Sequence, residues 1–243
     1  MRVVISQSML FPWVGLLEQV RLADVFVHYD DVQFSKGSFV NRVQVKTPEG
    51  VKWMTVPLRD LHLGQRIEEV QTMPIEQWRD THLQLLARSF EGAAYARDAM
   101  ALAEAVYDRQ PENLAQLARQ SLLSLCDYFG LGDTTRFVDV SALDANGSSS
   151  ERVLSVVRQL GGSTYITGHG ASSYLDHEFF EQHGIEVVYM DYQRRAYPQA
   201  HGAFTPYVSG LDLVAHCGRQ GRQQLCSGTV SWKEFAREPH RTI

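Results

Sequence analysis

Short runs of β-branched residues alternate along the chain with stretches whose apolar residues recur every three or four positions. The runs predict buried strands, and the three-to-four spacing predicts helices. Helices are expected after Phe11-Pro12-Trp13, from Glu151 to Leu160, and beyond Gly168-His169-Gly170 through Tyr174 and Phe180. The expected strands are Val3–Ser6, Val25–Tyr29, Phe137–Val140, Thr164–Thr167 and Glu186–Met190. This alternation requires crossover connections and predicts an α/β fold with a mostly parallel sheet flanked by helices.

A different pattern occupies the middle of the chain. Arg42–Lys46 and Val51–Val56 alternate across a Pro-Glu-Gly turn, which predicts a hairpin, and residues 57–64 are expected to form a loop. Residues 75–130 have helical spacing up to Gly130, a typical helix stop. We therefore expect one α/β domain over residues 1–243 with a helical insert at about 75–130.

Composition narrows the class of protein. With 243 residues and 44% hydrophobic residues, the chain can bury a full core without disulfides or metal. The net charge is −5 and no block of Lys or Arg occurs, which argues against a nucleic-acid or membrane-surface binder. The N-terminal segment matches neither a signal peptide nor a membrane span, so a cytoplasmic protein without membrane insertion is expected. No CxxC or HExxH motif occurs, so neither a metal nor a cofactor is expected.

The first candidate site follows the second predicted strand. Asp30 and Asp31 come at its carboxyl end, where ligands bind in open α/β sheets. Paired carboxylates suit acid/base chemistry or the binding of an ammonium group. The alternative is structural, with Asp30 capping a turn and Asp31 paired to Arg42. We expect one cleft to collect Gln7, Asp30, Asp31, Gln33, Asn41 and Arg42.

The second candidate is the turn Gly168-His169-Gly170, between a predicted strand and a predicted helix. Glycines permit close approach of a ligand, and a helix N-terminus offers free N–H groups to an anion. The turn lacks the lysine of a phosphate-binding P-loop and the third glycine of a dinucleotide fingerprint. A plain strand-to-helix turn capped by Ser172 or Ser173 is the alternative.

Histidine and cysteine provide further candidates. His82 shares an apolar helix face with Trp78 and Leu86, and is either a satisfied core histidine or a group that lines the cleft. Cys217 is a possible nucleophile, but its neighbour His216 points about 100° away on a helix, so another residue must activate it. All three cysteines, Cys126 and Cys226 included, are expected to be reduced.

Several segments together resemble one known family, the WbqC-like proteins, over nearly the whole chain. Gln7 and Phe11-Pro12-Trp13-Val14-Gly15 resemble the opening signature of that family. The other matching segments are Asp24-Val25-Phe26-Val27, Asp30-Asp31-Val32-Gln33-Phe34, Asn41-Arg42, Trp53-Met54-Thr55-Val56-Pro57, Tyr165-Ile166-Thr167-Gly168, Tyr174-Leu175, Gly184-Ile185, Tyr197-Pro198-Gln199 and Ser209-Gly210-Leu211-Asp212. The chain departs from the pattern of that family at two places. The family often has an aromatic residue where this chain has Leu16-Leu17, and a small residue where it has His169.

The resemblance implies a cytoplasmic bacterial transferase of O-antigen or lipopolysaccharide biosynthesis. Such a protein is expected to acylate the amine of a nucleotide sugar, with an acyl carrier protein as a possible partner. From the residues themselves we expect Asp30, Asp31 and His82 to be catalytic, with Asp30 or Asp31 binding the ammonium and His82 acting as general base. Expected substrate-binding residues are Gln7, Trp13, Gln33, Asn41, Arg42, Gly168, His169, Gly170, Tyr174 and Asp212.

Two other classes of function stay open at this point. One is an elimination or cyclisation on a molecule tethered to a carrier protein. The other is a non-catalytic partner that docks a carrier protein or a biosynthetic complex.

Overall fold

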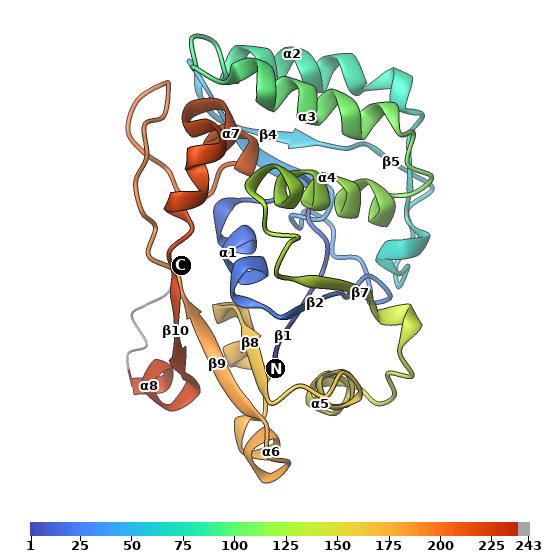
Figure 1. Cartoon of the computed structure of the whole chain (residues 1–243). Coiled ribbons are helices and arrows are strands. Elements are labelled where there is room, and N and C mark those ends of the chain that lie inside the picture. Colours follow the sequence, from blue (N-terminus) through green and yellow to red (C-terminus); the bar gives the residue numbers. More distant parts are fainter. Residues whose placement is uncertain (238–243) are drawn as a thin grey trace.

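A six-stranded, mainly parallel sheet forms the centre of the computed structural model, which describes residues 1–237 (Figure 1). The strand order is β10–β9–β8–β1–β2–β7, and only β10 runs antiparallel to its neighbour. The strands are β1 (Arg2–Ser6), β2 (Val25–His28), β7 (Arg136–Asp139), β8 (Thr164–Thr167), β9 (Glu186–Asp191) and β10 (Gly228–Ser231). The predicted α/β fold is confirmed, with each of the five predicted strands shifted by at most one residue at either end.

Helices cover both faces of the sheet because successive strand residues point to opposite sides. Val4 and Phe26 pack on the face covered by α1 (Val14–Leu22), α4 (Leu114–Phe129) and α7 (Gly210–Cys217). Val3, Ile5 and Val27 pack on the other face. That face is covered by α5 (Ser149–Gln159), α6 (His177–Gln182) and α8 (Trp232–Arg237).

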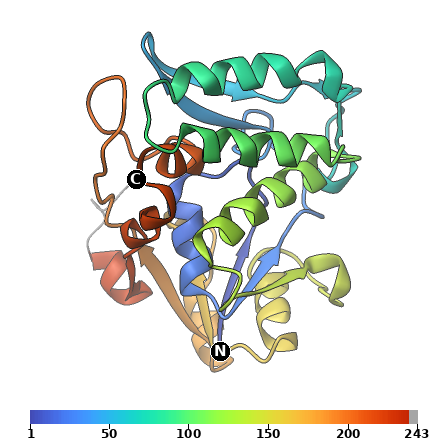
Figure 2. The ribbon, with the colours of Figure 1, turned by 45° about the horizontal axis from the view of Figure 1, so that its top comes forward.

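A long excursion between β2 and β7 forms the upper part of the molecule in Figure 1, and Figure 2 shows its helices from a second angle. It contains the predicted hairpin, then a second small hairpin, then three helices. The elements are β3 (Arg42–Thr47), β4 (Gly50–Thr55), β5 (Leu58–Arg59), η1 (Ile67–Glu69), β6 (Gln71–Thr72), η2 (Ile75–Gln77), α2 (Arg79–Ser89), α3 (Ala96–Asp108) and α4. The prediction of an unbroken loop at 57–64 is wrong, because β5 pairs with β6; two residues are too few to show alternation.

The chain changes direction in the sheet between β1 and β8. From β1 it builds outward through β2 to β7, and it then returns through η3 (Val140–Ala142) and α5 to β8 on the other side of β1. Because α1 and α5 lie on opposite faces, a crevice is expected where the carboxyl ends of β1 and β8 meet.

The segment after β8 differs from the predicted helix. A short 3₁₀ turn, η4 (His169–Ser173), comes first, and α6 begins only at His177. The Asp176 carboxylate accepts a hydrogen bond from the Phe179 N–H and caps α6 there. Tyr174 therefore lies before the helix. After α7, the turn η5 (Gly218–Gln224) leads to β10.

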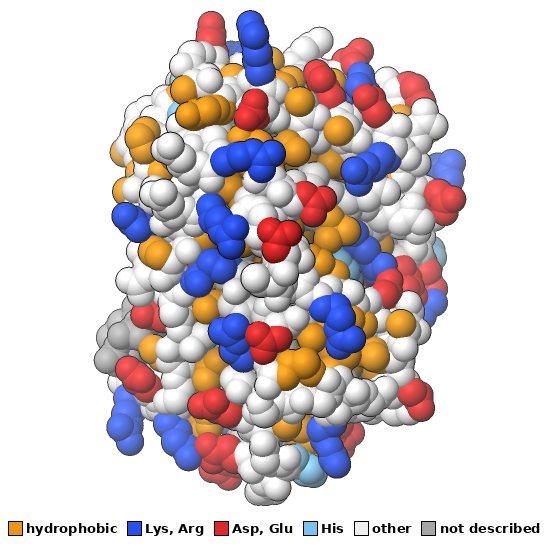
Figure 3. All heavy atoms as spheres, in the orientation of Figure 1, with side chains coloured by type: hydrophobic (Ala, Val, Ile, Leu, Met, Phe, Trp, Pro, Cys, Tyr) orange, Lys and Arg blue, Asp and Glu red, His pale blue; other side chains and the backbone are white. Residues whose placement is uncertain are grey.

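The described part of the chain contains no helix long and apolar enough to cross a bilayer. On the face shown in Figure 3, Lys and Arg side chains are interspersed with Asp and Glu. That face presents no extended field of one sign.

Candidate functional site at the sheet crevice

A cavity of about 550 Å³ opens at the point where the strand order reverses. Ser6 and Gln7 approach it from the end of β1, and Thr167 and Gly168 from the end of β8. Its other lining residues are Ile5, Met9, Gln19, Tyr29, Val32, Ser149, Val153, Tyr165, Gly170, Ala171 and Tyr174. This is the position at which open α/β sheets bind small molecules.

Strand alternation decides which residues reach the cavity. Ile5 and Val27 pair in register and face α5, and Gln7 and Tyr29 continue that face beyond the strand ends. Val4 and Phe26 face the opposite side, and Asp30 continues their face. As a result, Tyr29 lines the cavity, whereas its neighbour Asp30 lies on the opposite face of the sheet, against α4.

Three tyrosines provide hydroxyl groups at the cavity. Burial raises the pKa of Tyr29, Tyr165 and Tyr174, so all three stay protonated near neutral pH and can donate hydrogen bonds. Tyr165 donates to the Thr167 hydroxyl at 3.3 Å, whereas Tyr174 is 56% exposed at the mouth. Among the described lining residues, no side chain carries a charge at neutral pH.

Asp31 lies behind this wall in an ion pair. Arg152 of α5 donates to the Asp31 carboxylate, and its guanidinium lies 4.9 Å from the centre of the Tyr29 ring. The structural alternative for Asp31 is therefore favoured, although the partner is Arg152 and not Arg42. The second carboxylate oxygen of Asp31 is buried without a hydrogen-bond partner.

Asp30 is fully buried and points away from the cavity, toward α4. It accepts hydrogen bonds from the Ser8 N–H at 2.8 Å, the Ser8 hydroxyl at 2.7 Å and Arg119 Nε at 2.6 Å. Arg119 also pairs with Asp139. Since Ser8 lies between Gln7 and Met9, the carboxylate holds the loop that supplies two lining residues. The Asp30 carboxylate thus supports that loop and does not line the cavity, where the expected catalytic role would require it to be.

His28 completes this buried network, which sequence reasoning missed. The Ser8 hydroxyl donates to Asp30, so it accepts from His28 Nδ1 at 2.9 Å. Burial lowers the pKa of His28 to about 4, which keeps the ring neutral.

His82 does not reach the cavity, contrary to expectation. It is buried in α2, where Nε2 donates to the Thr55 carbonyl and Nδ1 accepts from the Tyr107 hydroxyl, both at 3.0 Å. Burial lowers its pKa to about 4. The structure thus favours the satisfied core histidine, because both ring nitrogens are occupied by the fold.

The other members of the expected polar set also lie elsewhere. Asn41 is buried and donates to the Val56 carbonyl at 3.3 Å, and Gln33 is exposed. The Arg42 guanidinium stacks on the Trp53 ring at 4.1 Å. Of the six side chains expected in one cleft, Gln7 alone is among the described lining residues.

Trp13 has a packing role. Its ring packs against Tyr192 and Tyr207 and lies so close to Gly15 that a Cβ there would meet it at 2.2 Å. The Gly210 N–H donates to the Pro12 carbonyl at 2.7 Å. A hydrogen bond therefore joins two segments of the family signature, Phe11–Gly15 and Ser209–Asp212, which lie about 200 residues apart in the sequence.

Asp212 and Cys217 belong to a separate cluster on α7. Asp212 accepts from the Tyr197 hydroxyl at 2.9 Å, and burial is the main factor that raises its pKa. His216 Nδ1 donates to the Asp212 carbonyl and its Nε2 accepts from the Ala200 N–H. His216 is therefore occupied, and burial raises the pKa of the Cys217 thiol. Neither feature favours a nucleophilic thiolate.

The turn after β8 lies at the cavity, but without the predicted helix. Gly168 and Gly170 line the cavity, while His169 donates from Nε2 to the Met190 carbonyl at 3.1 Å and packs beside Phe235. Because η4 is a 3₁₀ turn and Asp176 caps α6, the expected helix dipole does not face the turn.

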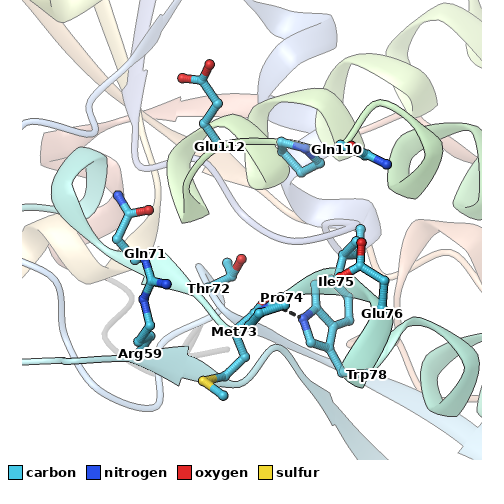
Figure 4. A pocket seen from close by; sticks show the side chains of 11 residues that line it. Arg59, Gln71, Thr72, Met73, Pro74, Ile75, Glu76, Trp78, Gln110 and Glu112 are labelled. Carbon is cyan, nitrogen blue, oxygen red and sulfur yellow. Dashed lines mark hydrogen bonds between the residues drawn. The ribbon is translucent and has the colours of Figure 1, made fainter.

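Figure 4 shows a second, smaller cavity of about 230 Å³ between β5, β6, η2 and the α3–α4 connection. Trp78 forms one wall and donates from its indole nitrogen to the Met73 carbonyl at 2.9 Å. No sequence-predicted site residue lines it. Within the described residues, no group of three His, Cys, Asp or Glu side chains is arranged to hold a metal ion.

Comparison with known proteins adds a family. The model of the WbqC-like protein family matches residues 7–224. The uncharacterized protein Rv1507c of Mycobacterium tuberculosis is 32% identical over 227 residues, which cover 92% of this chain and 97% of that protein. No solved structure matches the chain.

Proposed function

The chain belongs to the WbqC-like protein family, and we propose that it is a cytoplasmic transferase of polysaccharide biosynthesis. It acylates the amine of a nucleotide-linked amino sugar, and the acyl donor is a thioester, carrier-bound or free. The observation that carries the proposal is the cavity at the sheet crevice. Gln7, Thr167, Gly168 and Tyr174 line it and also belong to the segments that resemble the family signature.

The lining suits a sugar. Gln7 and Gln19 offer amide groups, and Ser149 and Thr167 offer hydroxyls, which both donate and accept hydrogen bonds. Sugar hydroxyls need partners of this kind, and Tyr29 and Tyr174 add aromatic surface. The volume of about 550 Å³ lies within the usual range for small-molecule sites.

Acyl transfer requires hydrogen-bond donors to the acyl oxygen, and the lining of this cavity contains such groups. The amine nitrogen attacks the thioester carbon, a C–N bond forms, and the C–S bond breaks. The nitrogen loses one proton and the leaving thiolate gains one, so that amine and thioester give amide and thiol. A negative charge develops on the acyl oxygen, and the protonated hydroxyls of Tyr29 and Tyr174 are the expected donors to it.

The test is a ligand screen followed by a turnover assay. UDP- and dTDP-linked 2-, 3- and 4-amino hexoses are titrated into the protein by calorimetry, and the best binder is then incubated with acyl thioesters. We expect saturable binding, amide formation and an equal amount of released thiol. Removing the Gln7 amide in Gln7→Ala should weaken binding about tenfold, by loss of one or two hydrogen bonds.

Gln33→Ala is the matched control, since Gln33 is exposed and is not among the lining residues. It should bind as the unaltered protein does. If none of these sugars binds, or if both variants lose affinity equally, the proposed function is wrong.

A further inference from the structure

The cavity offers no charged partner for an ammonium group among its described lining residues. Charged groups on the neighbouring segments are paired within the fold or exposed to solvent. Asp31 is not among the lining residues; one of its carboxylate oxygens is paired with Arg152, and the other is buried without a hydrogen-bond partner. Glu18 of α1 binds Arg21 and the backbone N–H groups of Cys226 and Ser227. Glu151 of α5 is exposed, and His169 binds the Met190 carbonyl.

A protonated amine would be disfavoured there, because moving an ammonium from water into a cavity whose lining carries no charge costs free energy unless an anion pairs with it. The Arg152 guanidinium lies 4.9 Å from the Tyr29 ring centre, but Asp31 pairs with it, so the ion pair puts no net charge behind the cavity wall. A neutral amine avoids the desolvation cost, because hydroxyl and amide oxygens of the lining can accept from its N–H groups and leave its lone pair free to attack.

We infer that the cavity binds its acceptor amine in the uncharged form. Desolvation of the amine on binding, and not a general-base side chain, then yields the nucleophile. The inference rests on the proposed function and names the protonation state of its substrate. The ammonium releases its proton to bulk solvent on binding. The lone pair then attacks the thioester as described above, without His82 or either aspartate as a base.

The test is the pH dependence of binding for a matched pair of ligands. The best-binding amino hexose from the screen and its hydroxyl counterpart are titrated from pH 6 to pH 9 by calorimetry. We expect affinity for the amino sugar to rise about tenfold per pH unit below the pKa of its amine, with one proton released. Affinity for the hydroxyl sugar should stay constant over the same range.

Asp31→Asn serves as the discriminating variant, because Asp31 pairs with Arg152, whose guanidinium lies against the Tyr29 ring of the cavity wall. The steep rise with pH should persist in this variant. Amino-sugar affinity that falls as pH rises, or does not change with pH, would overturn the inference and leave the proposed function standing. Absence of binding by either sugar would overturn both.

Discussion

Replacing Arg119 by methionine is expected to lower the free energy of unfolding by about 3–5 kcal/mol. Asp30 has no exposed surface, and Arg119 is the cation paired with it. The Ser8 hydrogen bonds remain in the variant, but they do not neutralise a buried carboxylate. Urea unfolding at pH 7, followed by tryptophan fluorescence, measures the loss.

Arg2→Met provides the matched control. Arg2 pairs with Asp24 at the surface, where both side chains are about half exposed, 50% and 42%. Such a pair contributes about 0–1 kcal/mol. Adding Asp30→Asn to Arg119→Met should recover part of the stability, because no charge is then left buried. Equal losses for Arg119→Met and Arg2→Met would contradict this description of the network.

Acidification from pH 6.5 to pH 4 is expected to destabilise the fold through two buried histidines. Burial lowers the pKa of both His28 and His82 from 6.5 to about 4. In that range the unfolded chain therefore binds protons that the folded protein does not. The contribution of each neutral histidine to the free energy of unfolding is fully present above pH 6.5. It is lost as the pH falls toward 4, by about 3 kcal/mol for each histidine.

The variant His82→Gln isolates one of these contributions. Unfolding free energies measured at intervals between pH 7 and pH 4 should fall about half as steeply in this variant. His62→Gln, at an exposed loop position, should leave the curve unchanged. If His82→Gln keeps the full slope, His82 is not the buried, uncharged group described here.

The sheet was predictable because its signal is local. Runs such as Val3–Ser6 and Thr164–Thr167 combine β-branched residues with bounding polar positions, and the order of elements then demands crossovers. The short hairpin of β5 and β6 carries no such signal, since its strands have two residues each.

The lining of the candidate cavity was predictable only where a motif marked it. Gln7, Gly168, Gly170 and Tyr174 were candidates and do line the cavity. Asp30 was expected at the cleft but is not among the lining residues. Its partner, Arg119, lies 89 positions later in the chain, so no local pattern indicates this pairing.

Other lining residues carried weak signals or none. Gln19 and Ser149 stand alone, without a motif. Tyr29 did carry a signal, the alternation along its strand, which puts it on the face of Val25 and Val27 and Asp30 on the other.

The position of the sugar in a crystal structure of the complex tests the central claim most directly. The claim is that the crevice between β1 and β8 holds the substrate. With the best-binding amino hexose, electron density for the sugar ring should lie within hydrogen-bonding distance of Gln7 and beside Tyr174. Density for the same ring in the cavity walled by Trp78, or anywhere else away from Gln7, would contradict the claim.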